Sequence, residues 1–121
     1  MSAEQEIVVR PKKWLYPVIL VLLKEENSHG YEVMERLQEE FGFEQISPAA
    51  VYRILRQMEN LGLCKTELEP IEGGPAHRVY SITAEGEAFL SAWVEACEQY
   101  RRVEETLSRV YKQSRTSRSS E

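Results

Sequence analysis

The sequence contains no aspartate, and all 20 acidic residues among its 121 are glutamates. Metal and catalytic sites that depend on aspartate are therefore excluded. Glutamate is more favourable than aspartate inside helices, so the composition favours a helical fold. Only 15 lysines and arginines are present, and the net charge is −5. Any binding to nucleic acid must therefore come from a local cluster of cations, because the protein as a whole is not basic.

Cysteines and long apolar segments are also few. The chain has two cysteines, Cys64 and Cys97, and its first residues show no basic segment followed by an apolar one. We therefore expect a cytoplasmic, reducing location. The longest apolar run, Trp14–Leu23, is half as long as the roughly 20 residues that a membrane-spanning helix needs. We interpret it as a buried helix of a single soluble domain and expect no membrane contact; a buried strand is the alternative.

A second helix is predicted between Asn27 and Gly42. Asn27 and Ser28 are the expected N-caps, because their side-chain oxygens can accept hydrogen bonds from the first free amides of a helix. Apolar residues then recur at helical spacing, and Gly42 marks the end.

The third predicted helix has the strongest start signal in the chain, Ser47 followed by Pro48, and Gly62 is its stop. One face is apolar and is expected to be buried. The opposite face is polar and carries Ala49, Tyr52, Arg53, Arg56, Gln57 and Asn60.

A β-hairpin is predicted next. Apolar and polar residues alternate from Cys64 to Glu69, which is typical of a half-exposed strand, and the segment His77–Ile82 is rich in β-forming residues. Pro70–Pro75 is predicted to be the turn, which gives a loop longer than the tightest types. Tyr80 and Ile82 share one strand face and are expected to be core residues.

Thr83 is the expected N-cap of a long last helix. Apolar residues then follow at alternating steps of four and three, which is a heptad pattern. These residues are Phe89, Trp93, Ala96, Tyr100, Val103, Leu107 and Val110. So much apolar surface on a terminal helix predicts a partner helix, hence a homodimer. Residues 113–121 contain no apolar residue, and we expect a disordered tail there.

This order of elements is that of a winged helix-turn-helix, in which the third helix enters the major groove of DNA and the hairpin lies along the backbone. The charge distribution agrees. Residues 27–46 hold one arginine and five glutamates, whereas residues 47–58 hold Arg53 and Arg56 and no acid. These two side chains are candidates for contact with phosphate or guanine, and simple solvation is the alternative.

Further candidates lie on the hairpin and on the second helix. Gly74, near the predicted tip, lets backbone approach phosphate, and His77 and Arg78 follow it, although Glu72 is adjacent and hairpin turns favour glycine anyway. Tyr31 lies at the start of the second helix, where amide groups can hold a phosphate.

Several motifs resemble those of the PadR-family transcriptional regulators, from about Trp14 to about Trp93. The motifs are His29-Gly30-Tyr31-Glu32, Val51-Tyr52-Arg53-Ile54-Leu55, Met58-Glu59, Gly62-Leu63 and Arg78-Val79-Tyr80-Ser81-Ile82-Thr83, followed by Gly86 and Leu90. Within that family, Trp14 with Pro17, Phe41-Gly42-Phe43-Glu44 and Glu72-Gly73-Gly74-Pro75-Ala76 are most similar to the poly-β-hydroxybutyrate-responsive repressors.

The resemblance implies a dimeric winged-helix repressor whose C-terminal helix forms the dimer and which an effector, a small molecule or a polymer, releases from a pseudo-palindromic operator. It also implies a phosphate contact for the Tyr52 hydroxyl, with packing of the ring on the hairpin as the alternative. Trp93 is a candidate ligand contact in this reading, and interface core is the alternative. Family members often carry Gly-Thr before this tyrosine; here the pair is Ala50-Val51, so their base contacts are not transferred.

The sequence therefore predicts a mostly helical protein with a small β-hairpin and four segments. They are a flexible arm (1–12), a winged helix-turn-helix (13–83), a dimerisation helix (84–112) and a disordered tail (113–121). The predicted DNA contacts are Ser47, Ala49, Tyr52, Arg53, Arg56, Gln57, Tyr31, Gly74, His77 and Arg78. No nucleophile elbow, phosphate loop or paired metal-ligand spacing occurs, so we expect no enzyme, cofactor or metal. A winged-helix module that binds protein instead of DNA is the alternative function.

Overall fold

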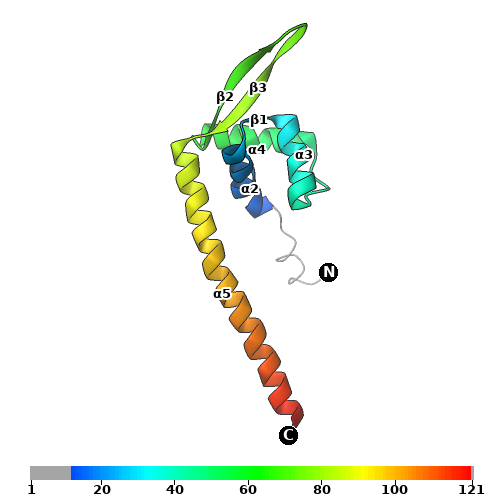
Figure 1. Cartoon of the computed structure of the whole chain (residues 1–121), viewed down its shortest axis with the longest axis vertical. Helices are drawn as coiled ribbons and strands as arrows, with labels where there is room; N and C mark the ends of the chain where they lie inside the picture. Colours follow the sequence, from blue (N-terminus) through cyan, green and yellow to red (C-terminus); the bar gives the residue numbers. More distant parts are fainter. Residues whose placement is uncertain (1–11, 121) are drawn as a thin grey trace. The chain divides into compact units, whose positions relative to one another are not determined.

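The computed structural model describes residues 12–120, and it is mostly helical with a small antiparallel sheet (Figure 1). The elements follow the order α2 (Lys12–Glu25), β1 (Ser28–His29), α3 (Gly30–Phe41), α4 (Pro48–Asn60), β2 (Cys64–Ile71), β3 (Gly74–Ile82) and α5 (Ala84–Ser120). They form two compact units, one ending at Leu90 and the other beginning at Ser91. The predicted fold class is confirmed. The arm expected at residues 1–12 lies outside the described residues, except for Lys12, which begins α2.

The core of the first unit is built around α2. Ile19, Leu20 and Leu22 are fully buried, and the apolar sides of α3 and α4 pack with them in one cluster. The Trp14–Leu23 run is therefore a buried helix, and the strand alternative is wrong. Among the described residues no helix is both long enough and apolar enough to cross a membrane.

The sheet has three strands in the order β1-β3-β2, one more than the predicted hairpin. Ser28 pairs with Tyr80 and His29 with Val79. The prediction that Asn27 and Ser28 cap the second helix is wrong, because this pairing holds Ser28 in an extended, buried strand. The N-cap is His29, whose backbone N–H donates to the Glu32 carboxylate at 2.9 Å.

The hairpin is longer and its turn is shorter than predicted. Only Glu72 and Gly73 connect β2 to β3, and Gly73 adopts a φ of +81°, which favours glycine. Pro70, expected in the turn, lies inside β2 at an irregularity of the register between Glu69 and Ile71. Proline has no N–H to donate, and β2 is an edge strand, where this loss is tolerated.

Thr83 caps α5 as predicted. Its hydroxyl accepts from the Gly86 backbone N–H at 3.0 Å and donates to the Gly62 carbonyl at 2.6 Å, which ties the end of α4 to the start of α5. Tyr80 is buried and Ile82 packs against the core, also as predicted.

The last helix is longer than predicted. It continues to Ser120, so the expectation of a disordered tail from residue 113 is wrong for residues 113–120. No glycine or proline follows Gly86 to end the helix. The Arg115 guanidinium also lies 5.9 Å from the centre of the Tyr111 ring, one turn earlier.

The second unit presents a row of exposed apolar side chains along this helix. Their exposed fractions run from 49% to 68%. They are Val94, Tyr100, Val103, Leu107, Val110 and Tyr111. Four of them belong to the predicted heptad seam, and the described chain leaves them in contact with solvent.

Candidate nucleic-acid interface

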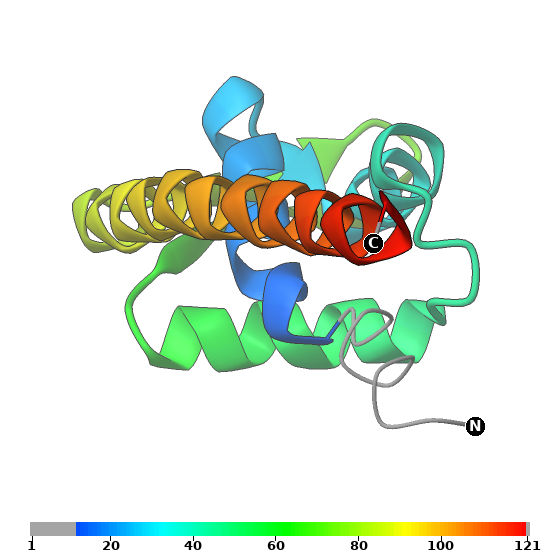
Figure 2. The same ribbon diagram turned by 90° about the horizontal axis from the view of Figure 1, so that it is seen from below.

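Helix α4 is fixed at both ends and along one side. The Ser47 hydroxyl accepts from the Ala50 backbone N–H at 3.2 Å, and Pro48 is the first helical residue, as predicted. Gly62, with a φ of +79°, follows the last turn. The buried side consists of Val51, Ile54, Leu55 and Met58. Figure 2 shows α4 along one edge of this unit, with no other helix or strand beyond its outer side.

All six predicted DNA-contact residues of α4 and its cap are exposed. They are Ser47, Ala49, Tyr52, Arg53, Arg56 and Gln57. An exposed helix of this kind has the dimensions that the major groove admits. The structure therefore brings the predicted reading residues together on one accessible surface.

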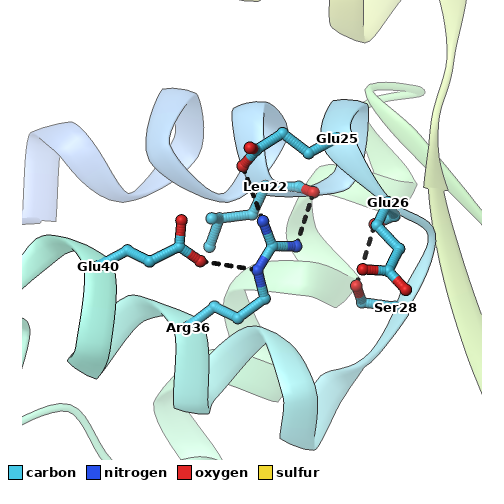
Figure 3. Close-up of polar contacts among 6 residues, drawn as sticks. All are labelled: Leu22, Glu25, Glu26, Ser28, Arg36 and Glu40. Atoms are coloured by element: carbon cyan, nitrogen blue, oxygen red, sulfur yellow. Dashed lines mark hydrogen bonds and ion pairs between the residues drawn. The ribbon is translucent and has the colours of Figure 1, made fainter.

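The arginines of α4 differ from the arginine of the neighbouring helix α3 in whether they form hydrogen bonds and ion pairs. In the described part of the chain, neither Arg53 nor Arg56 forms a hydrogen bond or an ion pair. Arg36 of α3, by contrast, is fully used (Figure 3). Its guanidinium donates to the Leu22 carbonyl at 3.0 Å, to Glu25 at 2.7 Å and to Glu40 at 2.9 Å.

These contacts give Arg36 a structural role. The hydrogen bond to Glu40 is the main reason that the pKa of Arg36 is raised, and only 19% of its side chain is exposed. The Leu22 carbonyl belongs to the last turn of α2, so Arg36 closes the end of that helix against α3. Arg53 and Arg56 therefore remain the cations of this region that are available to an external anion.

The ring of Tyr52 packs on Gly30, the first residue of α3. A β-carbon added at Gly30 would overlap this ring, so only glycine leaves room for it. Packing of the ring on the hairpin and a phosphate contact of the hydroxyl both stay predictions. Tyr52 is still 43% exposed, and its hydroxyl forms no hydrogen bond among the described residues. The glycine of the His29-Gly30-Tyr31 motif was the sequence feature that could have indicated this contact. Gly30 does not adopt a positive φ, so its backbone conformation does not require glycine, and the close approach of a ring does.

Further along α4, Gln57 is in contact with α2. The Tyr16 hydroxyl donates to the Gln57 side-chain oxygen at 3.0 Å. Tyr16 was not predicted as a site residue. Tyr52 and Gln57 thus contact two different helices, Tyr52 at the start of α3 and Gln57 on α2.

A cavity of about 650 Å³ opens beside this face of α4. Its walls are mainly apolar and include Leu15, Phe43 and Ile46, while Arg53 and Gln57 supply polar groups. Arg53 and Gln57 therefore lie both at the wall of this cavity and on the exposed face of α4.

The β-hairpin is a less favourable electrostatic partner for DNA than α4. Gly74, His77 and Arg78 are exposed, as the prediction requires, and so is Tyr31 on α3. However, the two strands and their turn carry two cations, Lys65 and Arg78, against three glutamates. In register, Glu69 lies opposite His77. The hairpin is therefore suited to a few local contacts and not to a broad grip on phosphates.

The outer half of the hairpin contacts the residue before α3 through two histidines, His77 of β3 and His29. The rings of His29 and His77 meet edge to face with centroids 4.9 Å apart. The Nδ1 atom of His29 lies 2.6 Å from the Glu32 carboxylate. The contact between the rings holds β3 beside the N-cap of α3.

The Cys64 thiol is buried against α4 and is not suited to redox or nucleophilic chemistry. It is 2% exposed, and its Sγ atom lies 3.7 Å from the Leu55 carbonyl. Burial raises the pKa of the thiol from 9.0 to about 11, and the Glu59 carboxylate adds to this. The reactive thiolate is therefore almost absent at neutral pH.

This shift predicts a loss of stability in alkali. The folded state holds the Cys64 proton more tightly than the unfolded chain, so the free energy of unfolding falls as pH rises from about 9 to about 11. The loss is at most about 3 kcal/mol from this group. Urea unfolding at pH 8 and pH 10.5 measures it. Cys64→Ala should make the difference smaller; a Cys64→Ala protein with the full difference would contradict the assignment.

The fold and the exposed helix α4 define a winged helix-turn-helix protein. The sequence profile described as the transcriptional regulator PadR-like family matches residues 19–92, which is more than half of the chain. The chain belongs to this family of transcriptional regulators.

Three relatives illustrate the match. The probable transcriptional regulator Rv1176c of Mycobacterium tuberculosis is 36% identical over 77 residues, which are 63% of this chain but only 41% of that protein. The PadR-like regulator BC4206 of Bacillus cereus has a similar structure, with a TM-score of 0.72, 26% identity and coverage of 80% of this chain and 93% of its own. Bacillus subtilis PadR, solved in complex with operator DNA, has a TM-score of 0.61 at 23% identity, covering 66% and 45%.

Proposed function

We propose that this protein binds operator DNA as a homodimer and places α4 of each protomer in a major groove. The observation that carries the proposal is the outer face of α4, where Arg53 and Arg56 are exposed and unpaired within the described chain. In a protein with a net charge of −5, these cations provide a local positive surface. The operator complex of Bacillus subtilis PadR supports the same use of the fold.

The exposed apolar row of α5 supports the dimer. Burying these side chains against a second copy would remove a contiguous apolar surface from water, and their spacing suits helix pairing. A two-fold dimer meets a two-fold operator, so the half-site centres should lie roughly 34 Å apart, or a multiple of that distance.

As a regulator of this kind, the protein is proposed to act as a repressor that an effector releases. A small molecule or polymer that changes the angle between paired α5 helices would move the two α4 helices out of register with the grooves. Trp93, half-buried in the predicted seam, is the candidate ligand contact, and the interface itself is its alternative role.

A binding assay tests the DNA proposal directly. The affinity for DNA upstream of the protein's own coding sequence should fall steeply as salt rises, because phosphate contacts release counterions. If the protein is instead a protein-binding module, no such DNA will be bound specifically at any salt concentration.

Arg53→Ala should weaken operator binding by about 1–3 kcal/mol if the guanidinium reads a base, and by less, equally across sequences, if it holds a phosphate. Fluorescence anisotropy at two salt concentrations separates these two outcomes. Arg101→Ala, which removes the same charge from an exposed position of α5, is the matched control. Unchanged affinity in an Arg53→Ala, Arg56→Ala double variant would remove this face of α4 from the DNA site.

A further inference from the structure

Tyr16 lies on α2, a helix that was not predicted to contact DNA. Its hydroxyl nevertheless forms a hydrogen bond with Gln57 of α4. We propose that Tyr16 is a positioning residue that sets the base specificity of Gln57. The inference rests on the proposed function, because it concerns how α4 reads DNA. It assigns to Gln57 the role of a hydrogen-bond donor toward guanine.

The Tyr16 hydroxyl has a fixed position that does not depend on α4. The ring is half-buried against the core cluster. It also meets the ring of Phe89, on the first turns of α5, with centroids 6.3 Å apart and planes at 50°. The ring is therefore held by α2 and α5, and the hydroxyl, 3.0 Å from the Gln57 oxygen, is a rigid reference point beside α4.

Gln57 itself is exposed, and within the described chain this is its one side-chain hydrogen bond. A glutamine without such a partner can turn either end of its amide to a base, and its usual pairing is with adenine, where the oxygen accepts from N6 and the nitrogen donates to N7. The Tyr16 hydroxyl occupies one side of the oxygen. The amide nitrogen, with its two donors, is then the end directed away from Tyr16.

Two donors match the acceptors N7 and O6 of guanine, whereas adenine offers one acceptor and one donor. The hydrogen bond from Tyr16 therefore favours guanine over adenine at the base that Gln57 faces. Because the bond involves no charged group, it should affect which base is chosen and leave the salt dependence of binding unchanged.

Tyr16→Phe is the variant that isolates this effect, since it removes the hydroxyl and keeps the ring. Operator sites selected from randomised half-sites should show a guanine preference at one position with the wild-type protein. With Tyr16→Phe, the preference of guanine over adenine there should fall about tenfold, which corresponds to roughly 1.4 kcal/mol. Ser108→Ala, which removes a hydroxyl from an exposed position of α5 outside the apolar row, should leave the preference unchanged.

A double-mutant cycle with Gln57→Ala tests whether Tyr16 acts through Gln57. In the Gln57→Ala background, Tyr16→Phe should have no further effect on selection or affinity. An equal loss in both backgrounds would overturn the inference, because the hydroxyl would then contact DNA itself. An unchanged base preference in Tyr16→Phe would overturn it as well.

A measurement without DNA covers the hydrogen bond itself. The side-chain amide signals of Gln57 in an amide nitrogen–proton NMR spectrum should shift in Tyr16→Phe, and identical signals would contradict the bond. If the wild-type protein selects no sequence at all, the proposed function fails together with this inference. If it selects a sequence that Tyr16→Phe selects equally, only the inference fails.

Discussion

Leu107→Glu is expected to convert the dimer into monomers at micromolar concentration and to lower operator affinity at least a hundredfold. Leu107 is 68% exposed in the described chain and lies in the middle of the apolar row of α5. In a paired seam each dimer would bury two copies of it, and full burial of a leucine contributes about 1.5–3 kcal/mol. Two carboxylates in the same place would have to be buried without partners or leave the helices apart.

The loss of operator affinity follows from linkage between the two half-sites. In a dimer, binding of one α4 brings the second to its half-site at high effective concentration, whereas a monomer binds each half-site alone. Sedimentation analysis and anisotropy, performed on the same samples, measure both quantities. Ser108→Glu adds the same charge one residue off the seam and should leave both unchanged. A Leu107→Glu protein that stays dimeric would place the interface elsewhere.

The helix that carries the proposed site could be predicted because its signals are local. Its start is marked by Ser47 and Pro48 and its end by Gly62, all of them next to the helix in the sequence. The apolar residues of α4 pack on the core, which leaves the opposite face of α4 exposed. No distant residue is needed to choose between alternatives. The exposed positions of Arg53 and Arg56 follow from the same period.

The contacts that orient the site could not be predicted, because they join residues far apart in the sequence. Ser28 is an excellent helix cap by type, but it pairs with Tyr80, and a two-residue strand has no periodicity to reveal it. Tyr16 meets Gln57 across 41 residues. Tyr52 packs on Gly30, where the informative feature is a missing side chain.

The same limit explains the errors at the hairpin and in α5. Two prolines and two glycines between residues 70 and 75 are typical of a long turn, but the edge strand β2 tolerates Pro70, and Gly73 alone supplies the left-handed conformation. Residues 113–120 lack apolar groups, which is the composition of a disordered segment. They also lack any residue that stops a helix already formed, and the helix continues through them.

Gly86→Ala is expected to destabilise the first unit by about 3 kcal/mol, although alanine is the better helix former. At an ordinary helical position this exchange would stabilise the protein by up to about 1 kcal/mol. Here the added β-carbon would overlap the Leu63 carbonyl oxygen and lie 2.8 Å from a side-chain carbon of Ile82. That oxygen is backbone and accepts the Thr83 N–H at 3.2 Å, so it cannot turn away as a flexible side chain would.

Because the close contact predicts destabilisation where helix propensity alone predicts stabilisation, the sign of the change in the free energy of unfolding tests how closely the start of α5 packs against the segment that follows α4. Urea unfolding of wild type, Gly86→Ala and Gly74→Ala measures it. Gly74 has no atom within 4 Å of an added β-carbon and an ordinary φ, so its exchange should change the free energy of unfolding by less than about 0.5 kcal/mol. A Gly86→Ala protein as stable as wild type would mean that the two segments are further apart. Thr83 could then not hold the start of α5 against Gly62, and the ring of Phe89 would no longer be fixed beside Tyr16.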